Sequence, residues 1–153
     1  MASRKPKGFS LLEAIIVVTF IAVIAAIAVP RLNFAVISKQ RAECAARKIV
    51  TDLHRTRQLA ITHAATNPAG YALNMLGAVP YSSYEIVRLD SVDTVDSLAI
   101  ESRVTCEGGV TFEFGPLGNL EPGSDTQMTV SAEGKTFTIT IVPATGAIKC
   151  VEN

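Results

Sequence analysis

The sequence predicts an α+β protein in which one long N-terminal helix packs, through its C-terminal half, on an antiparallel β-sheet domain. Three observations support this fold class. An apolar stretch covers residues 9–30, an amphipathic helical pattern follows over 31–65, and short β-type runs separated by turns fill 66–153. A chain of 153 residues is long enough to bury one domain's core.

The apolar stretch has the length of a membrane span. From Phe9 to Val29 the chain carries a single ionisable side chain, Glu13, and a helix of that length is about 30 Å long, the thickness of a bilayer's hydrocarbon core. Residues 1–8 form a basic leader with three Lys/Arg and no acid. The positive-inside rule therefore places the leader in the cytoplasm and sends the C-terminal body across the membrane.

Three interpretations of this stretch compete. A secretory signal peptide has a shorter apolar region followed by a small-x-small cleavage site, which Ala26-Ile27-Ala28 matches only nominally. A plain membrane anchor leaves Glu13 unexplained, because an acid at that depth costs about 2.5–3.5 kcal/mol on insertion scales. The third interpretation, an assembly helix that uses the acid, accounts for both features.

The leader and the start of the apolar stretch resemble a known motif. Residues 7–13 read KGFSLLE, which resembles the prepilin processing motif of type IV pilins and type II secretion pseudopilins. The resemblance implies that a prepilin peptidase cuts between Gly8 and Phe9, removes the leader, and methylates the new N-terminus of Phe9. It also implies a type IV pilin-like fold and a bacterial inner-membrane protein with a periplasmic globular domain, later built into a filament.

Glu13 gains a role once cleavage has created an α-ammonium on Phe9. Both charges are expensive in lipid unless they are paired. Pairing Glu13 with the ammonium of a neighbouring subunit would neutralise both and fix the axial stagger between subunits. Pro30 stands where many pilins carry a helix-bending proline, and it predicts either a kink near 26–30 or a simple end of the membrane helix.

Residues 31–65 read as a continuing helix with small apolar residues on one face. The spacing predicts a buried stripe that comprises Ala35, Ala42, Ala46, Ile49, Leu53, Ala60 and Ala64. The Lys/Arg excess on the other faces is interpreted as a solvated surface. His54 and His63 are nine residues apart and off-register for a shared metal site, and Cys44 is predicted to be a buried or half-buried apolar residue.

The rest of the chain alternates β-type runs with turns, starting after the loop cluster 66–70. Strands are predicted at 71–75, 83–89, 98–105, 109–114, 127–131, 136–142 and 147–151. The clearest hairpin connection is Ala132–Lys135. Residues 136–142 alternate Thr with Phe and Ile, as expected for a half-buried antiparallel strand.

Three segments of residues 31–153 resemble H-type minor pseudopilins and FimT-like minor pilins. These parts are the helix segment 46–61, the strand and Pro/Gly turn 110–118, and the closing Thr/Ile strand with Ala144-Thr145-Gly146. FimT-like relatives imply DNA capture as an alternative function. However, residues 65–153 hold four Lys/Arg against eleven Asp/Glu, a net charge of −7, which argues against nucleic acid as a partner.

Two further site hypotheses concern the globular part. Cys106 and Cys150 lie in or beside predicted strands, and export to an oxidising compartment favours a disulfide between them, with two unpaired buried thiols as the alternative. Asp90, Asp93 and Asp96 are three apart in a predicted loop. A solvated acidic loop is favoured over a calcium site because the run lacks the glycine and the ligand spacing of known calcium loops.

No catalytic or cofactor motif appears, so an enzyme is not expected and no cofactor or metal is assigned. The predicted function is that of a structural subunit, a minor pilin or pseudopilin, with a major pilin as the alternative. The presence of Glu13 argues against the glutamate-lacking tip subunit of the family. The implied partners are other pilin-like subunits, the prepilin peptidase, the inner-membrane assembly platform and, before assembly, membrane lipid.

Overall fold

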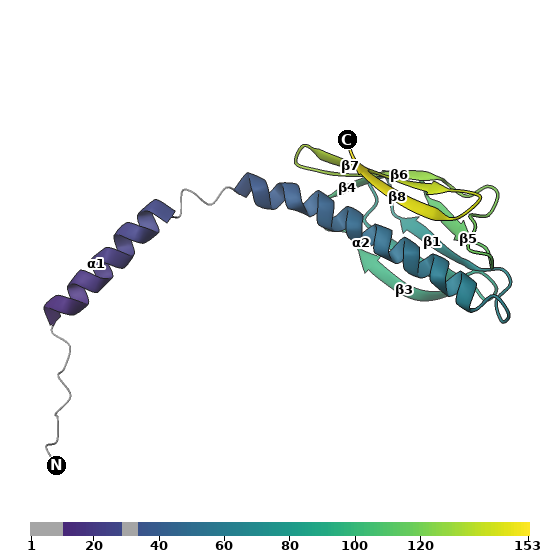
Figure 1. Ribbon diagram of the computed structural model, residues 1–153, viewed down its shortest axis with the longest axis horizontal. Coiled ribbons are helices and arrows are strands. Elements are labelled where there is room, and N and C mark those ends of the chain that lie inside the picture. Colours follow the sequence, from purple (N-terminus) through teal and green to yellow (C-terminus); the bar gives the residue numbers. More distant parts are fainter. Residues whose placement is uncertain (1–10, 29–33) are drawn as a thin grey trace, which may run out of the picture. The chain divides into compact units, whose positions relative to one another are not determined.

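The computed structural model describes residues 11–28 and 34–153, and these divide into two units, with the boundary between Phe34 and Ala35. The first unit contributes helix α1, Leu11–Ala28, and the second contains all of helix α2, Phe34–Thr62, except its first residue (Figure 1). The α+β class is thereby confirmed. No helix in the described part of the chain is both long enough and apolar enough to cross a membrane.

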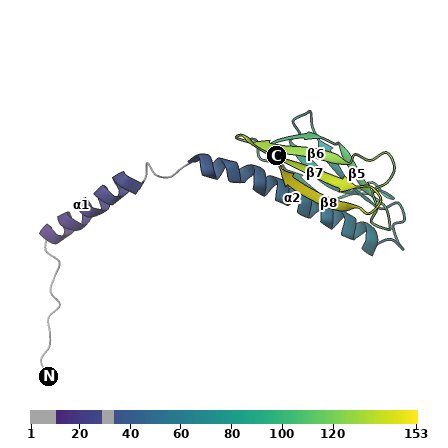
Figure 2. The same cartoon turned by 45° about the horizontal axis from the view of Figure 1, so that its top comes forward.

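The second unit contains two four-stranded antiparallel sheets (Figures 1 and 2). The first has the order β3-β2-β1-β5 and the second β4-β6-β7-β8. The strands are β1 Tyr71–Leu76, β2 Ser83–Arg88, β3 Asp93–Ala99, β4 Thr105–Gly108, β5 Thr111–Phe114, β6 Gln127–Ala132, β7 Lys135–Val142 and β8 Ala147–Glu152. The sequence led us to expect one β-sheet domain, and the division into two sheets is a finding of the structure.

One core joins α2 to both sheets. Its helix residues are Ala42, Ala46, Ile49, Leu53 and Ala60, each at most 2% exposed. They pack in the same cluster as Ile86 of the first sheet and Ile139 of the second. These five belong to the predicted stripe, which is confirmed for them. Ala64 is half-buried beyond the end of α2, and the side chain of Ala35 lies outside the described residues.

Strand β7 and its hairpin follow the prediction closely. Phe137, Ile139 and Ile141 are buried, while the alternate threonines are half-buried or exposed. The turn between β6 and β7 consists of Glu133 and Gly134, both with positive φ. Two such residues form the type of turn whose twist matches that of the flanking strands. Register pairs Ala132 with Lys135 directly across it.

The predicted strand 98–105 is wrong. Strand β3 starts earlier, at Asp93, and ends at Ala99, and β4 begins only at Thr105. Between them the chain turns, with the amide of Val104 donating to the carbonyl of Glu101 at 2.9 Å. The polar run from Glu101 to Arg103 is exposed, and it interrupts the apolar pattern that the single-strand prediction had joined.

Arg57 ties the C-terminal half of α2 to both sheets. Its Nε donates to the carbonyl of Gly118 at 2.9 Å, after β5, and its Nη2 donates to the carbonyl of Thr145 at 3.1 Å, between β7 and β8. Gly118 and Gly146 both have positive φ in these turns. A side chain at Gly146 would collide with the carbonyl oxygen of Gly118. The turn after β5 and the turn between β7 and β8 thus meet at a single arginine.

Candidate functional site

Helix α1 presents apolar side chains on all sides, and its residues 11–26 are exposed. Leu11 is 79% exposed and Phe20 is 69% exposed. A helix that is hydrophobic all round belongs in a protein core or in lipid rather than at an aqueous surface. A contiguous apolar surface of this size marks a contact with a partner or with a membrane.

Glu13 lies in the first turn of α1 and is the helix's only ionisable side chain. A carboxylate there is favoured by the positive end of the helix dipole. The other polar side chain, Thr19, is satisfied within the helix, because its hydroxyl lies 2.9 Å from the carbonyl oxygen of Ile15 and 2.8 Å from that of Ile16. Glu13 is therefore the only described residue of α1 that can attract a charged partner.

Several predicted site residues lie outside the described residues. These are the leader 1–8, the cleavage and methylation positions Gly8 and Phe9, and Pro30 with the predicted kink around it. Of the predicted membrane segment 9–30, the structure describes residues 11–28 as helix. The processing motif therefore stays a prediction from the sequence.

A groove of about 460 Å³ runs between α2 and the end of β3. Its lining includes the apolar side chains Ala45, Ile49 and Ile100, and Lys48 and Cys44 stand on its helix side. At one end Arg41 Nη1 lies 3.2 Å from Glu101 Oε1. This Nη1 is buried and makes no hydrogen bond of good geometry. The two side chains therefore form an ion pair without a hydrogen bond between these two atoms.

Most of the described cations on α2 are engaged within the chain. Arg41 pairs with Glu101, Arg47 with Glu43, and Arg55 with Asp96, the last at 2.6 Å. Arg57 donates to carbonyl groups, as described above. The prediction of a merely solvated cationic face is thus incomplete. Nucleic-acid binding needs cations free to neutralise phosphates, and this face offers few.

A carboxylate and a tyrosine form a buried pair beneath α2. Asp52 is 8% exposed, and its Oδ2 accepts a hydrogen bond of 2.5 Å from the hydroxyl of Tyr84 on β2. Burial, together with the adjacent carboxylate, holds the pKa of Tyr84 well above its usual range. The protonated phenol therefore donates to Asp52 and satisfies this buried polar side chain.

The acidic run Asp90–Asp96 is partly strand and not the loop that the sequence predicts. Asp90 lies in the turn after β2, whereas Asp93 and Asp96 belong to β3. Asp90 pairs with Arg88 and Asp96 with Arg55, so two of the three carboxylates already face arginines. The hydrogen bond from Arg55 lowers the pKa of Asp96. Within the described ranges no group of His, Cys, Asp and Glu side chains is arranged to hold a metal ion.

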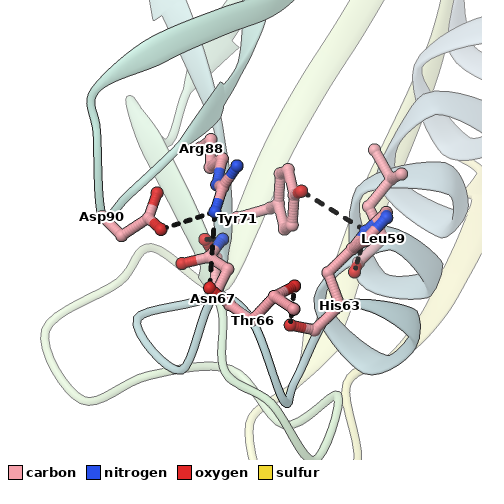
Figure 3. Close-up of polar contacts among 8 residues, drawn as sticks. Leu59, His63, Thr66, Asn67, Tyr71, Arg88 and Asp90 are labelled. Atoms are coloured by element: carbon pink, nitrogen blue, oxygen red, sulfur yellow. Dashed lines mark hydrogen bonds and ion pairs between the residues drawn. The ribbon is translucent and has the colours of Figure 1, made fainter.

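Figure 3 shows the polar contacts that follow the end of α2. Nδ1 of His63 lies 3.1 Å from the carbonyl oxygen of Leu59 and 3.3 Å from the hydroxyl of Tyr71. On the other side of the cluster, Nη2 of Arg88 lies 2.7 Å from Asp90 and 3.4 Å from the carbonyl oxygen of Thr66. These bonds hold the chain where it passes from helix to sheet, and they explain the histidine without a metal.

The buried Asn67 completes this connection. Its Nδ2 donates to the carbonyl of Gly70 at 2.6 Å. Gly70 has φ of 86°, and a side chain there would collide with the carbonyl of Phe114 on β5. An Asn and a Gly at these positions therefore allow the tight return of the chain into β1, as the loop cluster 66–70 predicts.

The predicted disulfide between Cys106 and Cys150 is wrong. Cys106 lies on β4 and Cys150 on β8, with β6 and β7 between them in the sheet. Neighbouring strands are about 4.8 Å apart, so the two sulfurs are too far apart to bond. All three cysteines are free thiols. The alternative of two buried thiols also fails, because only Cys106 is buried.

Cys44 is exposed on α2, which corrects the prediction of a buried or half-buried residue. The apolar stripe lies on the opposite side of the helix, as the burial of Ala42, Ala46 and Ile49 shows. Burial raises the pKa of the Cys106 thiol to about 11, which keeps that thiol protonated and unreactive at neutral pH. Cys44 and Cys150 are exposed, unlike Cys106, although partial burial also raises the pKa of the Cys150 thiol.

Comparison with protein-family models, with curated proteins and with solved structures found no match for this chain.

Two features of the site could not be recognised in the sequence. The groove joins α2 to Tyr84 and Ile100, which are far away along the chain. Val92, in the turn before β3, is 77% exposed and has φ of 56°. Left-handed conformations are rare for β-branched residues, so no local signal points to one here. The only available hint was the stripe Gln40, Cys44 and Lys48, whose four-residue spacing places all three on one side of α2.

Proposed function

We propose that the chain is a structural subunit, a minor pilin or pseudopilin, that assembles into a type IV pilin-like filament through its N-terminal helix. The observation that carries the proposal is α1: a helix exposed on all sides, apolar throughout, with one carboxylate in its first turn. Such a surface needs lipid or other apolar helices around it. The separately compact β unit, which follows it in the sequence, would be displayed on the filament's exterior.

The mechanism follows from the sequence around the helix. Cleavage between Gly8 and Phe9 creates an ammonium on Phe9, four residues before Glu13. In the inner membrane the subunit holds an unpaired carboxylate at a depth where charge is costly. Packing against a neighbour pairs that carboxylate with the neighbour's ammonium. Assembly therefore requires processing, because the ammonium exists only after cleavage. A subunit that packs incompletely keeps an unpaired charge, which costs free energy. The paired cations of α2 are a further argument for a structural rather than a DNA-binding role.

The decisive experiment compares Glu13→Ala with Glu43→Ala in cells that process and assemble the full chain. Glu43 forms a surface ion pair with Arg47 on α2, and such pairs contribute little. We expect both variants to insert and to be cleaved, and only Glu13→Ala to be missing from sheared filaments. Gly8→Ala should block processing and leave a chain longer by eight residues on a gel. Normal incorporation of Glu13→Ala would refute the pairing model.

A further inference from the structure

The turn between β2 and β3 presents an apolar side chain in a strained conformation. Val92 is 77% exposed with φ of 56°, a combination unfavourable in both burial and backbone energy. It is flanked by acids, with Asp90 two residues before it and Asp93 immediately after. We name Asp90–Asp93, with Val92 at its tip, the acidic knob.

The groove between α2 and the end of β3 has the complementary character. Its floor is apolar, with Ala45, Ile49 and Ile100, and its helix side carries the cations Arg41 and Lys48. Arg41 already faces Glu101. No ion pair joins Lys48 to another residue that the structure describes, although its charge contributes to the lowered pKa of Asp96 on β3. Lys48 lines the groove, where its ammonium can meet an incoming acid.

Knob and groove lie at opposite ends of β3. The knob precedes Asp93 and the groove takes in Ala99 and Ile100, so they are about 20 Å apart along the strand. Figure 1 shows β3 running beside α2 with its end directed toward the helix's N-terminal half. A chain cannot place its own knob in its own groove. A contact between knob and groove therefore joins different copies.

We propose that the acidic knob of one copy docks in the groove of the next copy, with Val92 against the apolar floor and Asp93 facing Lys48. Such a contact is heterologous and can repeat in one direction, which generates a fibre or a ring. Complementary charge on the two surfaces fixes the register and disfavours other pairings. The inference rests on the proposed filament and assigns a lateral contact within it.

Native Cys44 on the groove's helix side makes the contact measurable by thiol cross-linking. In a Cys150→Ser background, Ser91→Cys places a thiol on the knob, and a mild copper oxidant should join it to Cys44 of the next copy. The expected product on a non-reducing gel is a ladder of dimers, trimers and higher species from the assembled full chain. Adding Cys44→Ser should remove the ladder. Leu117→Cys, on a turn with an 86% exposed side chain, should give none.

Two further variants separate docking from folding. Lys48→Glu should lower the yield of the ladder by about threefold, the scale of one exposed charge pair, and adding Asp93→Lys should restore it. Val92→Asn should raise the Tm of the β unit by about 2–4 °C, because asparagine tolerates this backbone conformation. The same substitution should reduce the ladder, whereas Leu117→Asn should not. Stabilisation with undiminished cross-linking would overturn the proposal.

The outcome also distinguishes this proposal from the filament itself. If Glu13→Ala abolishes filaments while Ser91→Cys gives no ladder, as expected for Leu117→Cys, the docking contact is wrong and the filament stands. The same holds if Val92→Asn leaves the ladder undiminished, as expected for Leu117→Asn. If the processed wild-type chain forms no filament and the Ser91→Cys chain in the Cys150→Ser background gives no ladder, both are overturned. A single dimer in place of a ladder would contradict the repeating contact.

Discussion

The two helices of this chain differ in how their apolar side chains are arranged and in what covers them. Helix α2 distributes its residues so that one stripe is apolar, and that stripe is buried against two sheets of the same chain. Helix α1 has apolar residues on every side and buries none of those described. This difference indicates which residues can pack against the apolar side chains of each helix. For α2 the partner is encoded further along the chain, and for α1 the proposed filament supplies it from other copies.

The largest expected effect tests that division directly. Leu53→Ala removes a fully buried side chain from α2 and should lower the free energy of unfolding of the β unit by about 2–5 kcal/mol. Ile16→Ala, on α1, should leave that unfolding transition unchanged. Chemical denaturation of the full chain in detergent, followed by circular dichroism, measures both. Equal destabilisation by the two variants would show that α1 also depends on the β unit.

The second prediction concerns how α2 is fastened at its C-terminal half. Gly146→Ala adds a Cβ that collides with the carbonyl of Gly118, close to Arg57, and should cost about 2 kcal/mol or more. The matched control is Gly134→Ala, because Gly134 also has a positive φ but has open space around it. That control should cost only the backbone strain, about 1–2 kcal/mol. Comparable losses in both variants would mean that the contact with Gly118 can relax.

The sequence predicts α2 and β7 well because each has a clear period. A stripe at three- and four-residue spacing and an alternation of Thr with Phe and Ile both report which side faces a core. It fails at β3 because that strand lies at a sheet edge, is mostly exposed and contains a bulge opposite Ile86 and Val87. An exposed edge strand has little apolar alternation to detect, so its acids resemble a loop.

Some features of the candidate site can be predicted from the sequence alone, and others require the fold. Glu13 could be selected from the sequence because a lone acid in an apolar stretch is visible without a fold. The disulfide prediction fails because pairing two cysteines requires the strand order, which places β6 and β7 between Cys106 and Cys150. The groove likewise depends on which strand reaches α2, so it is a property of the topology and not of any segment.

The third prediction concerns the buried acid of α2. Tyr84→Phe leaves the carboxylate of Asp52 without its donor and should cost about 1–3 kcal/mol. Because the folded-state pKa of Tyr84 is raised, its contribution is complete below the unfolded value, near pH 10, and is lost as the pH rises above it. The wild type should therefore lose stability above about pH 10 more steeply than Tyr84→Phe. Parallel pH profiles would contradict the assignment.

The smallest expected effect lies on the exposed side of α2. Arg55→Gln removes the guanidinium whose hydrogen bond and charge hold down the pKa of Asp96. The carboxyl pKa of Asp96, followed by NMR, should rise toward its usual value, while the unfolding midpoint at neutral pH should barely move because both side chains are exposed. With the lowered pKa, the pair's contribution is present above the unfolded value near pH 4 and is lost as the pH falls through the folded one. The wild type and Arg55→Gln should consequently converge in stability at low pH. A large loss of stability at neutral pH would instead show that Arg55 holds β3 against α2. The charged face of α2 would then contribute to stability as its buried face does.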